Sequence, residues 1–176
     1  MLALKKHRSG RARTGIAALI ICGGFAPGLL GANWSASAQD QSAAKVEDAI
    51  VARKTVMDTL SDRMDQIEQM ISTNKINLEA AQQDADTVSV MLMAFPHLFP
   101  PASNQWKAGA EIDPVTGTYA SPDVWSKFPD FYKRASDASK TAYDMSRAEK
   151  DDALKSKTAE LRTACNACHA AYLKMQ

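Results

Sequence analysis

Two cysteines and a histidine near the end of the chain carry the clearest chemistry in the sequence. They belong to the run Cys-Asn-Ala-Cys-His at residues 165–169, and the spacing Cys-x-x-Cys-His is the attachment signature of c-type haem. In such a motif the two thiols bind the haem vinyl groups, and the histidine gives an imidazole nitrogen to the iron. On a helix, spacings of three and four residues place all three side chains on one face. The motif therefore predicts one covalently attached haem c, bound through Cys165 and Cys168, with His169 as an iron ligand.

Three other uses of the cysteine pair fit the sequence less well. A zinc site usually needs four nitrogen or sulfur ligands, and His97 is the only other histidine beyond the N-terminal segment. A thioredoxin-like redox pair lies near a βαβ pattern, and no strand-like alternation precedes this motif. A disulfide across two residues inside a helix would be strained.

The first 38 residues have the pattern of an export signal. An apolar stretch runs from Ile16 to about Leu30, and a small-x-small cleavage site follows at residues 36–38. A retained membrane anchor is the alternative, but the stretch is short for a span and is broken by two glycines and Pro27. We therefore expect a cleaved signal peptide at residues 1–38, export to the periplasm and one domain at residues 39–176. The basic residues before the apolar stretch are Lys5, Lys6, Arg8, Arg11 and Arg13.

The composition of the expected mature chain excludes several classes of partner. Without the five signal cations, 16 of the 21 basic residues remain against 20 acidic ones, a net charge of −4. This balance argues against nucleic acid and anionic lipid as partners. No membrane span is expected in the mature form, and its only cysteines are the two of the haem motif.

Apolar residues recur at helical spacing along the whole mature chain. We expect helices from Val46 to Ile71, from Lys75 to Phe95, from Ser121 to Met145 and over the last stretch to Tyr172. Pro96 ends the second helix, and Ser121 with Pro122 begins the third. The third apolar stripe is predicted to be Trp125, Phe128, Tyr132, Ala135, Ala138 or Ser139, Ala142 and Met145. These helices predict an all-α fold, an antiparallel four-helix bundle with covalently bound haem.

The stretch from Pro96 to Ser121 shows no sustained periodicity and is predicted to be a long loop. Loops of this length are often functional or covering. The aromatic residues Phe95, Phe99 and Trp106 suggest that the loop packs back onto the bundle.

Two residues of the first helix are candidates for the other side of the haem. Arg53 occupies a position where the stripe should be apolar, so a haem carboxylate is a suitable partner for it. The alternative is that the aliphatic part of the Arg53 side chain covers the core while its guanidinium reaches water. Met57 follows four residues later as a candidate second iron ligand, because thioether sulfur is a common partner of histidine in cytochromes. Its alternative role is core packing, and Met64, Met91 and His97 are rival ligands.

On these residues the chain resembles the class II c-type cytochromes, which include cytochrome c' and low-spin cytochromes of the c556 type. The resemblance is carried by residues 47–49 with Arg53 and Met57, by residues 122–125, and by residues 165–169 with Tyr172. It implies thioethers at Cys165 and Cys168, a proximal ligand at His169, a basic residue near the haem edge at Arg53 and a distal residue at Met57.

One position departs from the family pattern. The family usually has arginine or lysine four residues after the proximal histidine, whereas this chain has Leu173 followed by Lys174. A cation near the proximal ligand is therefore missing from that position or displaced.

A His/Met-ligated low-spin haem predicts a periplasmic electron carrier, not an enzyme, that exchanges single electrons with redox partner proteins. The alternative is a five-coordinate cytochrome c' that binds nitric oxide or carbon monoxide at an open distal face. A third possibility is a passive haem bundle that assembles with a larger redox complex. The resemblance also suggests a homodimer through the exposed faces of the first two helices.

Overall fold

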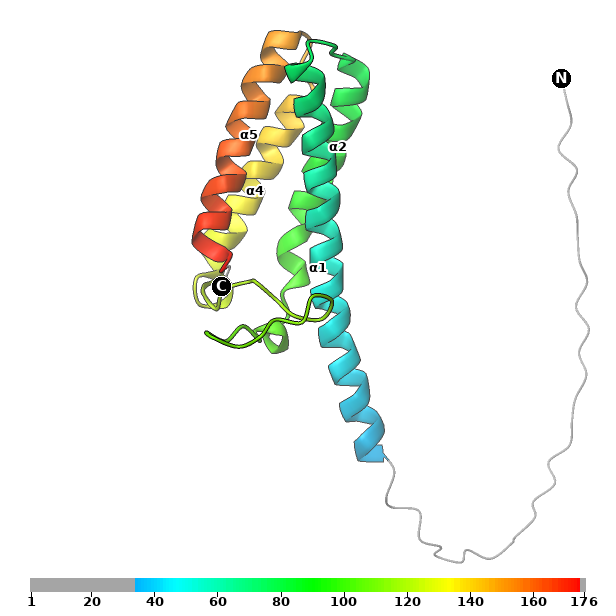
Figure 1. Cartoon of the computed structure of the whole chain (residues 1–176), viewed down its shortest axis with the longest axis vertical. Helices are drawn as coiled ribbons and strands as arrows, with labels where there is room; N and C mark the ends of the chain where they lie inside the picture. The colour runs from blue at the N-terminus through cyan, green and yellow to red at the C-terminus, as the bar shows by residue number, and fades with distance from the viewer. Residues whose placement is uncertain (1–33, 175–176) are drawn as a thin grey trace, which may run out of the picture. The chain divides into compact units, whose positions relative to one another are not determined.

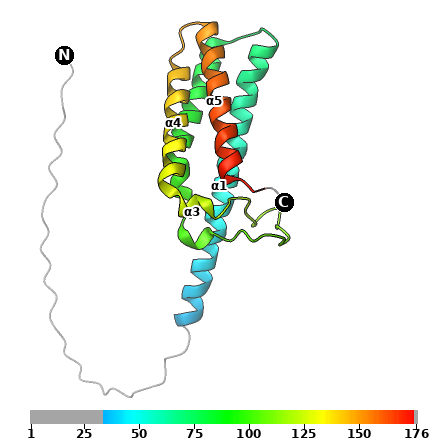
Figure 2. The same cartoon turned by 90° about the vertical axis from the view of Figure 1, so that its left-hand side faces the viewer.

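Four long helices lie side by side in the computed structural model, which describes residues 34–174 and the side chains from residue 45 onward (Figure 1). They are α1 (Trp34–Ser72), α2 (Leu78–Ala94), α4 (Phe128–Ser146) and α5 (Asp151–Tyr172). Short turns join α1 to α2 and α4 to α5, and a long crossover joins α2 to α4, as the turned view also shows (Figure 2). The antiparallel four-helix bundle predicted from the sequence is confirmed.

Local chemistry explains where α1 ends and α2 begins. Asn74 adopts a positive φ of 52° directly after α1, a conformation that often ends helices. The amide of Lys75 then donates to the Met70 carbonyl at 3.0 Å. The extended residue Asn77 caps α2, since its side chain accepts a hydrogen bond from the amide of Ala80 at 3.2 Å. These contacts satisfy backbone groups that helix ends leave unpaired.

The core away from the crossover is apolar and follows the predicted stripes of all four long helices. Small residues let α2 and α4 approach closely. At this contact Ser89 Oγ donates to the Ser139 carbonyl at 2.9 Å, and Ser139 Oγ donates to the Ser89 carbonyl at 2.8 Å. The buried members of this cluster are Leu60, Met64, Ile67, Ala81, Ala85, Val88, Leu92, Ala138, Ala142, Met145, Ala148, Leu154 and Leu161.

The third helix differs from the prediction because it is interrupted. A single turn, α3 (Asp123–Ser126), precedes α4, and Lys127 between them leaves the helical conformation. Pro129 in the first turn of α4 explains the break, since its ring cannot follow an uninterrupted helix. The break changes which residues face the core. Tyr132, predicted in the stripe, is 44% exposed, and Phe131 is buried in its place.

The start of this region follows the sequence prediction more closely. Ser121 is buried, and its Oγ accepts a hydrogen bond from the amide of Asp123 at 3.1 Å. Ser121 therefore caps the first turn, as predicted.

The crossover packs against the bundle through aromatic side chains, as predicted. It contains two short 3-10 turns, η1 (Phe95–Leu98) and η2 (Pro101–Ser103). Phe95 and Phe99 are buried, whereas Trp106 is half-buried. Phe99 meets Phe131 edge to face with ring centroids 4.9 Å apart. This geometry is favourable for aromatic pairs, so the crossover forms part of the core.

The end of the crossover also pairs with the end of α5. The amide of Ser121 donates to the Tyr172 carbonyl, and the amide of Lys174 donates to the Tyr119 carbonyl, both at 2.8 Å. Ala120 and Leu173 form an antiparallel bridge between these hydrogen bonds. The loop is thereby attached to the helix that carries the haem motif.

The predicted export signal lies mostly outside the described residues. Its basic and apolar regions fall within residues 1–33, whereas α1 begins at Trp34, before the predicted cleavage site. Among residues 34–174, no helix is long and apolar enough to cross a membrane.

Replacing Leu154 by alanine tests the packing of this core. Leu154 is fully buried, so the substitution should lower the free energy of unfolding by about 2–5 kcal/mol. Val115 in the crossover is 64% exposed, and Val115→Ala should change stability by about 0.5 kcal/mol or less. Chemical denaturation of the holoprotein, followed by far-ultraviolet circular dichroism, measures both values. Equal losses in the two variants would contradict the assigned core.

Candidate haem site

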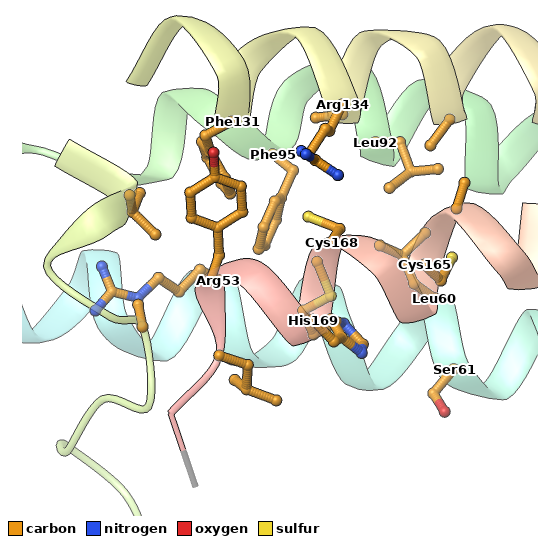
Figure 3. A pocket seen from close by; sticks show the side chains of 18 of the residues that line it. Arg53, Leu60, Ser61, Leu92, Phe95, Phe131, Arg134, Cys165, Cys168 and His169 are labelled. Atoms are coloured by element: carbon orange, nitrogen blue, oxygen red, sulfur yellow. The ribbon is translucent and has the colours of Figure 1, made fainter. Parts of the chain in front are cut away.

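A cavity of about 380 Å³ lies within the bundle, with walls from α1, α2, α4 and α5. Its size falls in the range of about 300–1,000 Å³ that is typical of cofactor sites. Aliphatic side chains such as Leu60, Val88 and Leu92 line it, and Figure 3 labels two of them, Leu60 and Leu92. The aromatic residues that line it are Phe95, Phe99, Phe131 and Tyr172.

The three residues of the haem motif line this cavity from α5. Cys165 and Cys168 are half-buried free thiols, and His169 lines the cavity while part of the residue remains exposed to solvent. All three lie on one stretch of α5 that faces the space beside α1 (Figure 3). The helical spacing therefore brings the motif together on one cavity wall, as the sequence predicted.

Burial shifts the pKa values of all three residues of the motif. Burial raises the pKa of Cys168 to about 11, and burial also raises the pKa of Cys165. Both thiols therefore stay protonated at neutral pH until they react. Burial, followed by the positive charge of Arg162, lowers the pKa of His169. Its imidazole is therefore mainly neutral at neutral pH, which is the form that binds a metal.

The chemistry of the cavity fits haem better than the other uses of the motif. Within residues 45–174, no three His, Cys, Asp or Glu side chains form a group that could hold a metal ion. A zinc site built by the protein alone is therefore not supported. The cavity is mostly apolar and has two thiols and one imidazole on its wall. These features suit haem, whose flat ring is mostly apolar and which brings its own iron.

Met57 lies on the α1 wall of the same cavity, where it is half-buried. It packs against the apolar core described above and against a second cluster of buried residues. The members of that cluster are Phe95, Phe99, Val124, Phe131 and Tyr172. Among its predicted rivals, Met64 also lines the cavity, but it is more deeply buried. Met91 belongs to the apolar core, and His97 is an exposed residue whose ring meets Tyr132 edge to face. Neither Met91 nor His97 is among the residues that line the cavity.

Arg53 is buried at the edge of the cavity, so the alternative of a guanidinium that reaches water is wrong. Its side chain is only 4% exposed. Its Nη1 donates to Ser103 Oγ at 2.9 Å, and its Nη2 donates to the Ser103 carbonyl and to Thr118 Oγ1. The guanidinium carbon also lies 4.8 Å from the ring centroid of Phe99. Burial lowers the pKa of Arg53 to about 10, so it remains a cation at neutral pH.

Four residues of this region were not identified from the sequence. Ser103 and Thr118 hold Arg53, but a hydroxyl in a loop gives no periodic signal. Arg134 on α4 and Arg162 on α5 also line the cavity (Figure 3 labels Arg134). The position of Arg162 could have been inferred, because it precedes Cys165 by three residues and lies on the same helical face.

Tyr172 and Arg134 are linked through a carboxylate on α4. Tyr172 Oη donates to Asp130 Oδ2 at 2.5 Å, and Arg134 Nε donates to the same oxygen at 2.7 Å. These bonds tie the last turn of α5 to α4 close to Cys168. Leu173, where the family pattern has a cation, is partly exposed and also lines the cavity.

Solved structures with a similar fold are cytochromes c'. The cytochrome c' of Thermochromatium tepidum has a TM-score of 0.65 and 22% identity, covering 74% of this chain and 97% of its own. A cytochrome c' described by an unusual ligand-controlled dimer dissociation has a TM-score of 0.63 and 17% identity, covering 74% and 97%. The nitric oxide complex of a cytochrome c prime variant from Alcaligenes xylosoxidans has a TM-score of 0.62 and 16% identity, also covering 74% and 97%. At these identities the likeness shows the fold.

The family of the chain follows from a sequence model rather than from these folds. No curated protein sequence matches the chain significantly. A family model described as Cytochrome C' matches residues 48–173, which include both the first-helix residues and the haem motif. The chain therefore belongs to the cytochrome c' family, whose members bind one covalently attached haem c.

Proposed function

We propose that this protein is a periplasmic haem protein that binds nitric oxide or carbon monoxide on the α1 side of its haem. The observation that carries the proposal is the cavity itself, which has the haem motif on its α5 wall and Met57 on its α1 wall. In this proposal Cys165 and Cys168 form the thioether bonds and His169 is the proximal ligand. When bound, the haem iron supplies a coordination position for a small neutral ligand and single-electron redox chemistry.

The family supports gas binding over the electron-carrier function that the sequence analysis put first. The chain belongs to the cytochrome c' family, in which five-coordinate iron that binds nitric oxide or carbon monoxide is typical. One of the proteins with the same fold was solved as a nitric oxide complex. The apolar walls of the cavity suit a small neutral ligand, because they admit it without having to desolvate a charge.

A second candidate function is the electron carrier with Met57 as a sixth ligand, as in the low-spin branch. The observation that favours it is the position of Met57, whose thioether is half-buried on the cavity wall of α1. The two functions differ in one bond. If the Met57 sulfur binds the iron, the coordination position for gas is filled.

The buried charge of Arg53 supports the proposal that this residue meets a haem carboxylate. Among the described residues, Arg53 forms no ion pair, and its hydrogen bonds go to neutral oxygens. An uncompensated buried cation is costly. A guanidinium has five N–H donors, so it can hold both the loop and a carboxylate of the haem. The loop would then cover the haem edge through the same side chain.

We further propose that residues 1–38 are a cleaved export signal and that the mature domain is residues 39–176. Attachment of haem c agrees with export, since bacterial cells complete it outside the cytoplasm. A homodimer through α1 and α2 is part of the proposal, because the apolar residues Val51, Val90 and Met93 are exposed on these helices. The cytochrome c' described by a ligand-controlled dimer dissociation offers a precedent for dimer formation by a protein of this fold.

The absorption spectrum of the reduced holoprotein distinguishes the two functions. Five-coordinate iron should give a broad visible envelope with a high-spin Soret band, and the bands should shift when carbon monoxide or nitric oxide is added. Sharp, split α and β bands that carbon monoxide leaves unchanged would contradict gas binding and would favour the Met57-ligated carrier.

Substitution of Met57 tests its role on the distal side. If Met57 only packs beside the ligand position, Met57→Ala should keep the iron high-spin and should speed carbon monoxide association several-fold, because it removes bulk from the α1 wall. Met91→Ala is the matched control, since Met91 is a half-buried methionine that does not line the cavity; it should leave the association rate unchanged. Stopped-flow mixing measures both rates. A change from low-spin to high-spin iron in Met57→Ala would instead identify Met57 as a ligand.

Substitution of Arg53 by lysine tests the connection between α1 and the loop. Lysine keeps the charge but cannot bridge Ser103 and Thr118 or stack on Phe99 in the same way. The free energy of unfolding of the holoprotein should fall by about 1.5–3 kcal/mol, and residues 101–118 should become more sensitive to protease. Lys54, whose Nζ donates to the Pro114 and Val115 carbonyls from the exposed side, provides the control. A similar decrease in the free energy of unfolding in Arg53→Lys and Lys54→Met would contradict this account. It would show that the buried contacts of Arg53 stabilise the loop no more than the exposed contacts of Lys54.

A further inference from the structure

Arg162 connects α5 to α1 beside the haem cavity. Its Nε donates to Glu68 Oε1 at 2.6 Å, and its Nη2 donates to Glu68 Oε2 at 2.9 Å and to Asp65 Oδ1 at 3.2 Å. Paired hydrogen bonds from one guanidinium to one carboxylate define the orientation of both groups. The charge of Arg162 is therefore held in one place by the opposite helix.

This charge lies in line with His169 on the same helix. Seven residues separate Arg162 from His169, which is two helical turns, or about 10 Å along the axis. Cys165 lies between them, and all three line the same cavity. Because helical side chains lean toward the N-terminus, the imidazole leans toward the turn that carries Arg162.

Other charged side chains at the cavity are arranged differently. Arg134 pairs with Asp130 on its own helix, α4, and Arg53 is bound to neutral oxygens of the loop. Lys54 reaches the loop from α1, and Asp58 is an exposed residue at the rim. Arg162 differs because it belongs to the helix of the haem motif and is paired with carboxylates of another helix.

We propose that Arg162, held by Glu68 and Asp65, is a positioning residue whose charge raises the reduction potential of the haem. The inference rests on the proposed attachment of haem to Cys165, Cys168 and His169. Ferric haem carries one more positive charge than ferrous haem, so a nearby cation disfavours the ferric form and a nearby carboxylate favours it. The side chains of Arg162 and Glu68 are half-buried, so solvent screens their charges only in part, whereas Asp65 is exposed.

A purely structural role for this ion pair makes a different prediction. If the pair only holds α1 against α5, removing either partner loosens the same contact, and both changes should move the potential in the same direction. If charge is what matters, the two removals should move it in opposite directions. The direction of the change in reduction potential therefore distinguishes the two roles, whatever the size of the change.

The experiment is a spectroelectrochemical titration of the exported holoprotein and its variants at low salt. Arg162→Gln should lower the midpoint potential, Glu68→Gln should raise it, and the double variant should lie between the two. At a fixed applied potential, each single change should alter the ferric-to-ferrous ratio by about threefold or more. Arg162→Lys keeps the charge and should restore a potential close to that of the unmodified protein.

A matched control comes from another ion pair between helices. Arg63 on α1 pairs with Asp84 on α2 at 3.1 Å, and neither residue lines the cavity. Arg63→Gln should lower stability without moving the potential. The inference would be overturned if the midpoint reduction potential moved in the same direction in Arg162→Gln and Glu68→Gln. It would also be overturned if the potential changed in neither variant.

Two further measurements keep the result interpretable. If Arg162→Gln does not fold, Glu68→Gln alone still tests the inference. A lowered or unchanged reduction potential in Glu68→Gln would contradict it. Haem attachment is scored separately by haem staining of denatured protein. Loss of covalent haem in Cys165→Ala/Cys168→Ala supports the attachment on which the inference rests. Retention of covalent haem in that variant would overturn the attachment itself.

Discussion

The structure depends on an apolar cavity between the helices of the bundle. The cavity of about 380 Å³ is lined mostly by apolar side chains, so its size and polarity suit a mostly apolar cofactor. The haem c of the family is such a cofactor. The helices can then be understood as walls: α5 presents the residues of the Cys-x-x-Cys-His motif, α1 lies on the opposite side, and the small residues of α2 and α4 let those helices pack closely.

The crossover between α2 and α4 is part of the same construction. Its aromatic residues close one end of the cavity, and its last residues pair with the backbone at the end of α5. Arg53 joins this loop to α1 from inside, whereas Lys54 holds it from outside. The loop therefore contacts α1 and also α5, the helix that carries the haem motif. These contacts explain how a segment without a periodic sequence packs against the bundle.

Much of this arrangement could be predicted from the sequence because it depends on periodicity and on one specific motif. The stripe of α5 determined that Cys165, Cys168 and His169 would share a face. The interruption before α4 differs from the prediction. Ser121 and Pro122 indicate one helix start, and Pro129 begins a second helix that the apolar stripe alone does not reveal. Phe131 replaced Tyr132 in the core for that reason.

The partners of the charged residues could not be predicted. Arg53 was identified as an anomaly, but its contacts with Ser103 and Thr118 join positions 50 and 65 residues apart, and no local pattern encodes them. The helical spacing places Arg162 on the face of the haem motif, but its partners Glu68 and Asp65 lie on α1, more than 90 residues away, so the sequence does not reveal the pairing. Such pairings become visible only when the helices are placed side by side.

The most direct test of this account is mass spectrometry of the exported protein after denaturation and proteolysis. The peptide that contains Cys165 and Cys168 should carry the added mass of one haem, with both thiols blocked against alkylation. Recovery of that peptide without added mass and with two alkylated thiols, from cells able to mature c-type cytochromes, would contradict the account.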